Sequence, residues 1–266
     1  MRVIVTRPQR EAQDWVRELA AAGLPAQALP LIDIRPAPEP AALARAGQQL
    51  AAAGYAGVMF VSANAAAGFF ASNKAVAGVF SVESAIKTRA WSPGPGTTKA
   101  LLRAGVAPER IDAPASDAAQ FDSEALWQVV GPQVQPGDRV LIVRGGDAQS
   151  ADTGAGSGRD WLARRLAEAG ATAEFVVAYQ RARPQFDVAQ QQLAAAAAAD
   201  GSVWLFSSSE AVHNLQACLP GQSWQAARAV ATHPRIAAAV RQAGFGVVRE
   251  SRPALVDIKA SIESMQ

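Results

Sequence analysis

The sequence predicts an α/β protein with two parallel β-sheets, each covered by helices on both faces. Its 266 residues exceed one average domain, and half of them are hydrophobic, which is enough to form two cores. Short apolar runs alternate with helical patterns of about ten to fifteen residues, as in parallel-sheet folds. The same order of segments also occurs twice along the chain.

The first copy of this order begins at the N-terminus. A β-branched run over residues 3–7 ends in Arg7 and predicts a strand, and a helical pattern over 11–22 follows it. Gly23 ends this helix. An extended run over 26–36 comes next and ends in Arg-Pro.

The second copy begins at residue 140. A strand over 140–146 contains Arg144, and it leads to a helix over 159–169 that Gly170 ends. An extended run over 173–184 again ends in Arg-Pro. Residues 147–158, rich in Gly, Ser, Ala and Asp, predict a mobile loop inserted between the strand and its helix.

Two further pairs of segments match in the same order. Residues 57–65 and 202–211 each predict a buried strand that ends in a small hydroxyl residue just before a helix. Residues 90–101 match 230–240, and an Ala-Gly pair follows each of them. Chance could produce one such pair, so four in register indicate an internal duplication. The alanine-rich residues 193–199 predict a plain helix.

Composition excludes several classes of protein. Lys and Arg number 25 against 23 Asp and Glu, so the net charge of +2 is too small for a nucleic-acid footprint. One cysteine, Cys218, excludes a disulfide framework and a thiolate metal cluster, and two histidines leave little for a metal site. We therefore expect no cofactor. The N-terminus lacks a signal-peptide core, and the uncharged residues 55–73 contain Ser and Asn, so we expect a cytoplasmic protein without a membrane span.

Polar residues follow most of the predicted strands. Right-handed crossovers bring these loops to one edge of a parallel sheet, where open α/β sheets bind ligands. Free backbone N–H groups and helix dipoles at such junctions favour anions. The hydroxyls of Ser and Thr there serve either as additional donors or simply as helix caps. These hydroxyl residues are Ser62, Thr97, Ser208 and Thr232.

Tyr179 and three arginines are the most specific candidates. Tyr179 is one of two tyrosines and lies in the extended run that crosses between the predicted domains, where its phenol is either a hydrogen-bond donor or a packing residue. The arginines Arg7, Arg144 and Arg159 are either carboxylate ligands or solvated surface charges.

Other catalytic motifs are incomplete. The serines at 207–209 lack the glycines of a nucleophile elbow, and neither His213 nor His233 has a partner that would make a Ser–His triad. Residues 94–97 are similar to a dinucleotide-binding loop, but the third glycine and the later acidic residue are missing.

Together these segments resemble the uroporphyrinogen-III synthase family over almost the whole chain. The matching stretches are 3–8, 30–32, 60–65, 94–97, 141–145, 158–159, 179–181 and 206–208. The resemblance implies two flavodoxin-like, doubly wound domains joined by two extended linker strands. The implied domains are residues 1–36 with 184–266, and residues 37–183.

The resemblance also implies the reaction. Linear hydroxymethylbilane would lose water and close to uroporphyrinogen III, with inversion of the last pyrrole ring and without a cofactor. Tyr179 would assist departure of the hydroxyl, and we expect a monomer with no nucleic-acid or membrane partner. The expected substrate-binding residues are Arg7, Ser62, Asn64, Gly96, Thr97, Arg144, Arg159, Ser207, Ser208, Thr232 and Arg235.

Two features depart from the family pattern. The second-half counterpart of residues 94–97 is expected at 232–235, where Arg235 replaces a hydroxyl and would hold a carboxylate. The insertion at 147–158 separates Arg144 from Arg159. The alternative function is a non-catalytic two-lobed module that binds a small polyanion.

Overall fold

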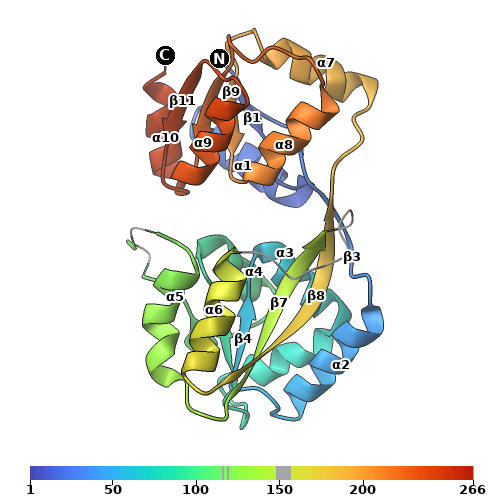
Figure 1. The fold of residues 1–266 in the computed structure, drawn as a ribbon, viewed down its shortest axis with the longest axis vertical. Coiled ribbons are helices and arrows are strands. Elements are labelled where there is room, and N and C mark those ends of the chain that lie inside the picture. The colour runs from blue at the N-terminus through green and yellow to red at the C-terminus, as the bar shows by residue number, and fades with distance from the viewer. Residues whose placement is uncertain (116, 119, 148–156, 266) are drawn as a thin grey trace. The chain divides into compact units, whose positions relative to one another are not determined.

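The computed structural model describes residues 1–115, 117–118, 120–147 and 157–265, without the side chains of 157–160. The chain divides into two compact units, shown as a ribbon in Figure 1. Unit 1 contains residues 1–33 and 182–266, and unit 2 contains residues 34–181. The chain therefore leaves unit 1 once and returns to it once.

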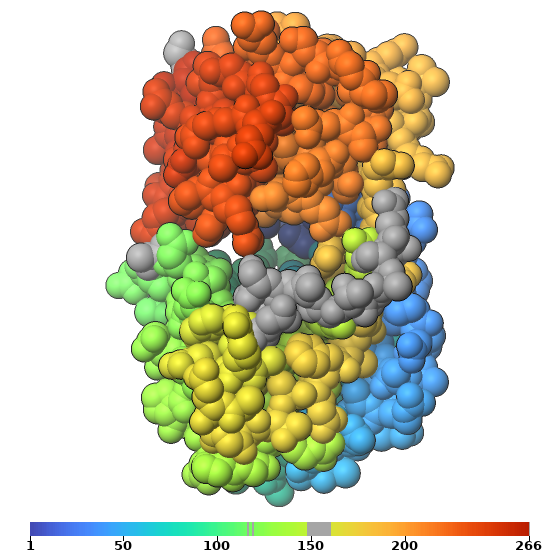
Figure 2. Space-filling model, in the orientation of Figure 1, coloured from blue at the N-terminus to red at the C-terminus, as the bar shows by residue number. Residues whose placement is uncertain are grey.

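Unit 1 contains a five-stranded parallel sheet in the order β11-β10-β9-β1-β2. Its strands are β1 (Val3–Val5), β2 (Ala26–Ala28), β9 (Val203–Phe206), β10 (Arg228–Ala231) and β11 (Val247–Glu250). Its helices are α1 (Gln9–Ala21), α7 (Val188–Ala197), α8 (Ser209–Cys218), α9 (Pro234–Gln242) and α10 (Leu255–Glu263). On the face shown in Figure 2, the C-terminal segment forms most of the surface of this unit.

Unit 2 contains a six-stranded sheet in the order β3-β8-β7-β4-β5-β6, parallel from β8 to β6. Its strands are β4 (Gly57–Phe60), β5 (Arg89–Trp91), β6 (Ile111–Asp112), β7 (Arg139–Asp147) and β8 (Thr172–Ala182), with β3 (Asp33–Pro36) at the edge. Its helices are α2 (Pro40–Ala51), α3 (Ala63–Ser72), α4 (Pro95–Arg103), α5 (Ser123–Val130) and α6 (Ser157–Glu168), with short 3-10 turns at Lys74–Phe80, Pro108–Arg110 and Gly131–Gln133.

The strand orders confirm the duplication. Reading β8-β7-β4-β5-β6 beside β2-β1-β9-β10-β11 places every pair of matched segments at the same position in its sheet. Both orders follow the flavodoxin-like pattern when β7 and β1 are counted as first strands. The predicted fold class, two doubly wound parallel sheets, is therefore confirmed.

Local sequence explains why these elements form where they do. All four residues of β4 and all four of β9 are buried, as expected for strands covered on both faces. Gly23 and Gly170 follow the first helix of each repeat with φ of +84° and +78°, a conformation that L side chains rarely adopt. The two helix ends predicted from these glycines are therefore confirmed.

Each sheet packs apolar residues on both of its faces. In unit 2, Phe60 packs with Phe69 and Phe70 on one face, whereas its neighbour Met59 joins a separate cluster on the other. In unit 1, Trp204 stacks on Phe206 at 6.1 Å, while the adjacent Val203 and Leu205 join the opposite cluster. This alternation along a strand gives each unit its own two-sided core.

One expected alignment was wrong by one residue. Gly94 is the N-cap of α4, with Pro95 first in the helix, and His233 is the N-cap of α9, with Pro234 first in that helix. His233, and not Thr232, is therefore the counterpart of Gly94. Proline fixes this register because its missing N–H and restricted φ suit the first helical position.

Two further expectations concern single segments. Residues 55–73 form β4 and α3, as expected, and no helix in the described part of the chain is long and apolar enough to span a membrane. Most of the predicted loop at 147–158 lies outside the described residues.

Candidate functional site

The carboxyl ends of β7 and β8 place Tyr179 at the edge of the unit 2 sheet where doubly wound folds commonly bind ligands. The two strands run on side by side past their neighbours (Figure 1), and their pairing shifts between Arg144 and Gly145. This shift pairs Gly145 with Tyr179. The ring of Tyr179 then covers Gly145 so closely that a Cβ there would lie 2.5 Å from the Tyr179 Cζ atom. A glycine at 145 is thus required to seat the phenol.

The Tyr179 hydroxyl meets Ser62 at the end of β4. The two side-chain oxygens are 3.1 Å apart, and either can donate. Ser62 is also the N-cap of α3, where its Oγ accepts the Ala65 N–H at 3.1 Å. The interpretation of Ser62 as a helix cap is therefore correct, and the same hydroxyl can also form the hydrogen bond with Tyr179. Tyr179 itself is only 6 % exposed.

Helix α3 approaches β8 closely enough to hold this pair. A Cβ on Gly68 would lie 2.4 Å from the Ala178 carbonyl oxygen, so only glycine permits the contact between α3 and β8. The chain leaves β4 toward β5 and leaves β7 toward β8, so the two connections run in opposite directions along the sheet. Doubly wound folds bind ligands between two such neighbouring strands.

The N-terminus of α4 supplies a second group of donors on the same edge. Ser92 Oγ donates to the Gly94 carbonyl at 2.9 Å and lies 2.9 Å from Thr98 Oγ1. Thr97, which we predicted, is 5 % exposed and buried against the core. Gly96 is exposed, and an added Cβ would meet no atom within 4 Å. Thr98, absent from our prediction, is the threonine that lines the surface here.

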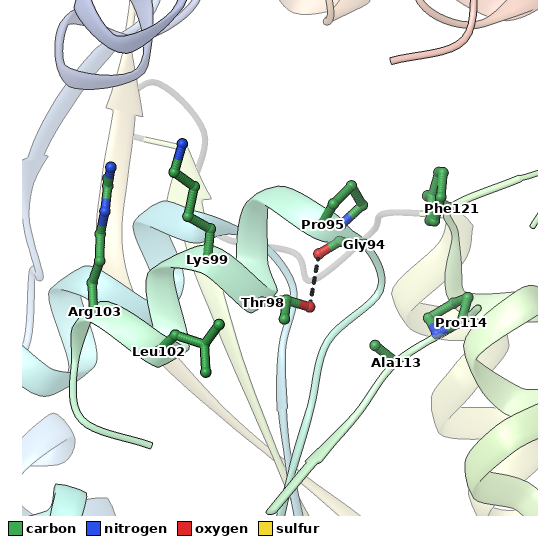
Figure 3. A pocket seen from close by; sticks show the side chains of 9 residues that line it. All are labelled: Gly94, Pro95, Thr98, Lys99, Leu102, Arg103, Ala113, Pro114 and Phe121. Carbon is green, nitrogen blue, oxygen red and sulfur yellow. Dashed lines mark hydrogen bonds between the residues drawn. The ribbon is translucent and has the colours of Figure 1, made fainter. Parts of the chain in front are cut away.

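A groove of about 580 Å³ runs beside α4 (Figure 3). One wall carries Thr98, Lys99, Leu102 and Arg103, and the other carries Ala113, Pro114 and Phe121. Lys99 and Arg103 project from the same face of the helix. Sequence reasoning missed this groove, although two cations four residues apart on a helix were a visible signal.

The remaining predicted residues of unit 2 have different environments. The side chain of Arg144 is buried, with 8 % exposed, and its guanidinium lies 5.3 Å from the ring centre of Phe175. The interpretation of Arg144 as a solvated surface charge is therefore wrong. Asn64 lies in the first turn of α3. The side chain of Arg159 lies outside the described residues.

In unit 1, Arg7 follows β1 and packs against α1, the next helix along the chain. Its Nη1 lies 3.4 Å from Glu11 Oε2, and its guanidinium lies 4.9 Å from the ring centre of Trp15. Burial lowers the pKa of Arg7, and the nearby Glu11 opposes that shift. Its Nε has no hydrogen-bond partner among the described residues, so a donor remains for a ligand. Arg7 is not a solvated surface charge.

The serines after β9 and the residues after β10 continue this edge. Ser208 caps α8 by accepting the Glu210 N–H at 3.2 Å, so its capping role is confirmed. Ser207 directly follows β9, which pairs with β1. Thr232 directly follows β10, and the His233 Nδ1 accepts the Arg235 N–H at 3.1 Å. His213 is exposed on α8.

The structure therefore brings together Tyr179, Ser62 and Gly145 in unit 2. It places the other described candidates along the carboxyl edge of one sheet or the other. Among the described residues there is no group of three or more His, Cys, Asp or Glu side chains that could hold a metal ion. The chemistry available is hydrogen bonding and positive charge, which suits an anionic substrate.

Comparisons with known proteins identify the family. The family model described as uroporphyrinogen-III synthase HemD matches residues 13–257. A mutant uroporphyrinogen III synthase from Thermus thermophilus has 15 % identity and a TM-score of 0.52, with 100 % of this chain and 98 % of that one covered. A wild-type structure from that bacterium has 15 % identity and a TM-score of 0.42, with 99 % and 96 % covered. No curated protein matches the sequence significantly.

Proposed function

The chain belongs to the uroporphyrinogen-III synthase family, and on that premise we propose that Tyr179 and the strand-end donors bind hydroxymethylbilane and direct its closure. The enzyme is a lyase of heme biosynthesis that forms uroporphyrinogen III with loss of water and inversion of the terminal pyrrole ring. The proposal concerns which side chains do this.

The reaction sets a selectivity problem more than a rate problem. Loss of the hydroxyl leaves an electrophilic azafulvene, which closes unaided to the non-inverted isomer. The enzyme must favour attack through the substituted carbon of the terminal ring, by way of a spiro intermediate. Each tenfold preference requires only about 1.4 kcal/mol of differential stabilisation, which a fixed substrate geometry can supply.

Tyr179 is proposed to assist departure of the hydroxyl. The observation that carries this role is the 3.1 Å contact between its hydroxyl and that of Ser62. The contact lies at the topological switch point of the sheet, between β4 and β7. When Ser62 donates in this pair, the phenol proton points elsewhere and can donate to the leaving oxygen. Ser62 is thereby a positioning residue as well as a helix cap.

The substrate carries eight carboxylates. Many dispersed hydrogen-bond donors can bind them better than one deep charged pocket can. We assign the carboxylates to arginines, to strand-end hydroxyls and to the exposed N-termini of helices such as α4. The buried Thr97 supports its helix terminus, and Thr98 presents the hydroxyl. The proposed donors are Arg7, Ser62, Asn64, Gly96, Arg144, Arg159, Ser207, Ser208, Thr232 and Arg235.

The test is product analysis. Purified protein is given enzymatically generated hydroxymethylbilane, the products are oxidised, and the type I and type III porphyrins are separated by chromatography. We expect type III to predominate. Type I alone, formed at the rate of the protein-free reaction, would refute the catalytic assignment and favour a binding module. Gel filtration of the same sample tests the expected monomer.

A further inference from the structure

The groove between α4 and the residues after β6 contains two cations and an apolar wall to which no role has been assigned above. We propose that it binds one pyrrole ring of the linear tetrapyrrole, with the ring against the apolar wall and its acetate and propionate arms on Lys99 and Arg103. This inference rests on the proposed function and assigns a subsite to it.

The groove has room for one ring and its two arms. Its volume of about 580 Å³ falls within the roughly 300–1,000 Å³ of typical small-molecule sites. A linear tetrapyrrole carries four such rings and eight acidic arms, so only part of the substrate can enter. The groove lies wholly within unit 2, at the carboxyl ends of β5 and β6.

The wall of the groove is apolar although it is exposed. Leu102 is 44 % exposed, an unusual fraction for a large aliphatic side chain on a helix that packs against a sheet. Pro95, Pro114 and Phe121 extend this surface (Figure 3). A flat, neutral heteroaromatic ring is the ligand that such a surface favours, because aromatic and proline faces pack against it without losing hydrogen bonds.

The charges of the groove complement the arms of the ring. Lys99 and Arg103 are one helical turn apart and point the same way from α4 (Figure 3). Side chains at this spacing lie about 5–6 Å apart at their Cβ atoms. The two carboxylates of one pyrrole leave adjacent ring carbons on short flexible arms, so both can reach the pair. Arg103 can bind its carboxylate through two N–H groups, whereas Lys99 acts as a point charge.

Charge removal is the first test. Lys99→Gln and Arg103→Gln should each raise the KM for hydroxymethylbilane about fivefold, since exposed ion pairs contribute up to about 1 kcal/mol. The double variant should raise it further and should weaken the salt dependence of KM. The kcat should stay within about twofold of the original value, because the two side chains are proposed to hold carboxylate arms and not the reacting carbon. Lys74→Gln, which removes an exposed charge from the same unit, is the matched control and should leave KM unchanged.

Direct binding is the second test. Porphobilinogen, a single pyrrole with one acetate and one propionate arm, is titrated into ¹⁵N-labelled protein. We expect shifts of amide signals from α4 and from residues 113–115, with weaker binding in Leu102→Ala and Phe121→Ala. Val82→Ala, a loss of exposed apolar surface elsewhere in unit 2, is the control. Thermal melts followed by circular dichroism verify that each variant is folded.

The outcomes separate this inference from the proposed function. Type III product with an unchanged KM in the double variant, or porphobilinogen shifts outside the groove, would overturn the subsite and leave the catalytic assignment standing. If the original protein forms only type I, the catalytic assignment fails. Porphobilinogen shifts confined to α4 and 113–115 would then still support the groove as a site for carboxylated pyrroles.

Discussion

Tyr179 and Ser62 share one hydrogen bond between hydroxyls, and the direction of that bond determines what each can offer a substrate. Ser62 Oγ accepts the Ala65 N–H, and either hydroxyl can donate in the pair with Tyr179. When Ser62 donates, the phenol proton is available to a third group. This arrangement holds the phenol in place through a second hydroxyl, which suits assistance to a leaving hydroxyl that must depart as water.

The first prediction concerns this phenol. Tyr179→Phe should lower the kcat for type III product by about tenfold or more, because general acid assistance typically contributes at least that much. The fold should be unchanged, since the ring still covers Gly145. Isomer-resolved kinetics measure the effect. Tyr55→Phe removes the only other phenol and should leave kcat unaltered; equal rates in all three proteins would exclude Tyr179 from the mechanism.

Tyr55 occupies the opposite, amino-terminal edge of the unit 2 sheet. Its hydroxyl lies 2.5 Å from Gln49 Oε1 and 3.0 Å from Glu174 Oε2, and Arg139 lies over its ring at 4.9 Å. Burial, together with the hydrogen bond to Glu174, raises the pKa of Tyr55 to about 12 from an ordinary value of 10.0. Because ionisation is harder in the folded state, this group stabilises the fold below pH 10, and that contribution is lost as the pH rises through 12.

The second prediction is the titration of Tyr55. In the Tyr179→Phe variant it is the only phenol, so absorbance at about 295 nm reports it alone. We expect a midpoint near 12 in the folded protein and one near the ordinary value in urea. A midpoint near the ordinary value in both states would show that Glu174 and burial do not act on this hydroxyl.

At the scale of elements, Arg110 holds together the irregular segment between α3 and β5. Its side chain is 9 % exposed and donates to the carbonyl oxygens of Ser81 at 3.1 Å, Ile86 at 3.0 Å and Ser84 at 2.8 Å. These carbonyls belong to a loop without strand or helix pairing, so one guanidinium supplies the donors that regular structure would otherwise provide.

The third prediction follows from this clamp. Arg110→Met should lower the free energy of unfolding by about 2 kcal/mol, because the loop carbonyls lose charged donors and gain only partial access to water. Urea denaturation measures the change. Arg45→Met, at an exposed position on α2, should change stability by less than about 0.5 kcal/mol. Similar losses in both variants would mean that Arg110 has no special role.

Elements were predictable from the sequence, but their contacts were not. Alternating buried strands and amphipathic helices, with Gly23 and Gly170 as stops, define the repeat locally. The contact of Tyr179 with Ser62 depends on the pairing shift at Gly145, which joins segments far apart in the chain. Likewise, the exposed Leu102 is part of a groove only because Ala113, Pro114 and Phe121 lie on its other side. Such features arise from tertiary packing, which residue spacing does not encode.

At the scale of the molecule, unit 2 is one continuous stretch of chain. Residues 34–181 contain all six strands of its sheet except the first residue of β3 and the last of β8, together with cores on both faces. Unit 1, by contrast, combines residues 1–33 with the chain after 181. Both domain boundaries that the resemblance implies, after residues 36 and 183, lie close to these crossings.

The fourth prediction is that residues 34–181 fold alone. The fragment should show cooperative urea unfolding and the circular dichroism of an α/β protein, because it retains its complete core. An isolated fragment that unfolds gradually, without a sigmoidal transition, would show that unit 2 depends on unit 1. The full chain, measured in parallel, gives the reference transition.

The placement of β1 inside its sheet, between β9 and β2, has a consequence for synthesis on the ribosome. β1 pairs with β9, whose first residue is Val203, so the N-terminal strand leaves the exit tunnel long before one of its neighbours has been translated. Throughout that interval the apolar residues 3–5 lack this partner, while the whole of residues 34–181 emerges behind them. Nascent chains are therefore most exposed to aggregation and to chaperone capture at their first strand, and slower translation would lengthen that exposure.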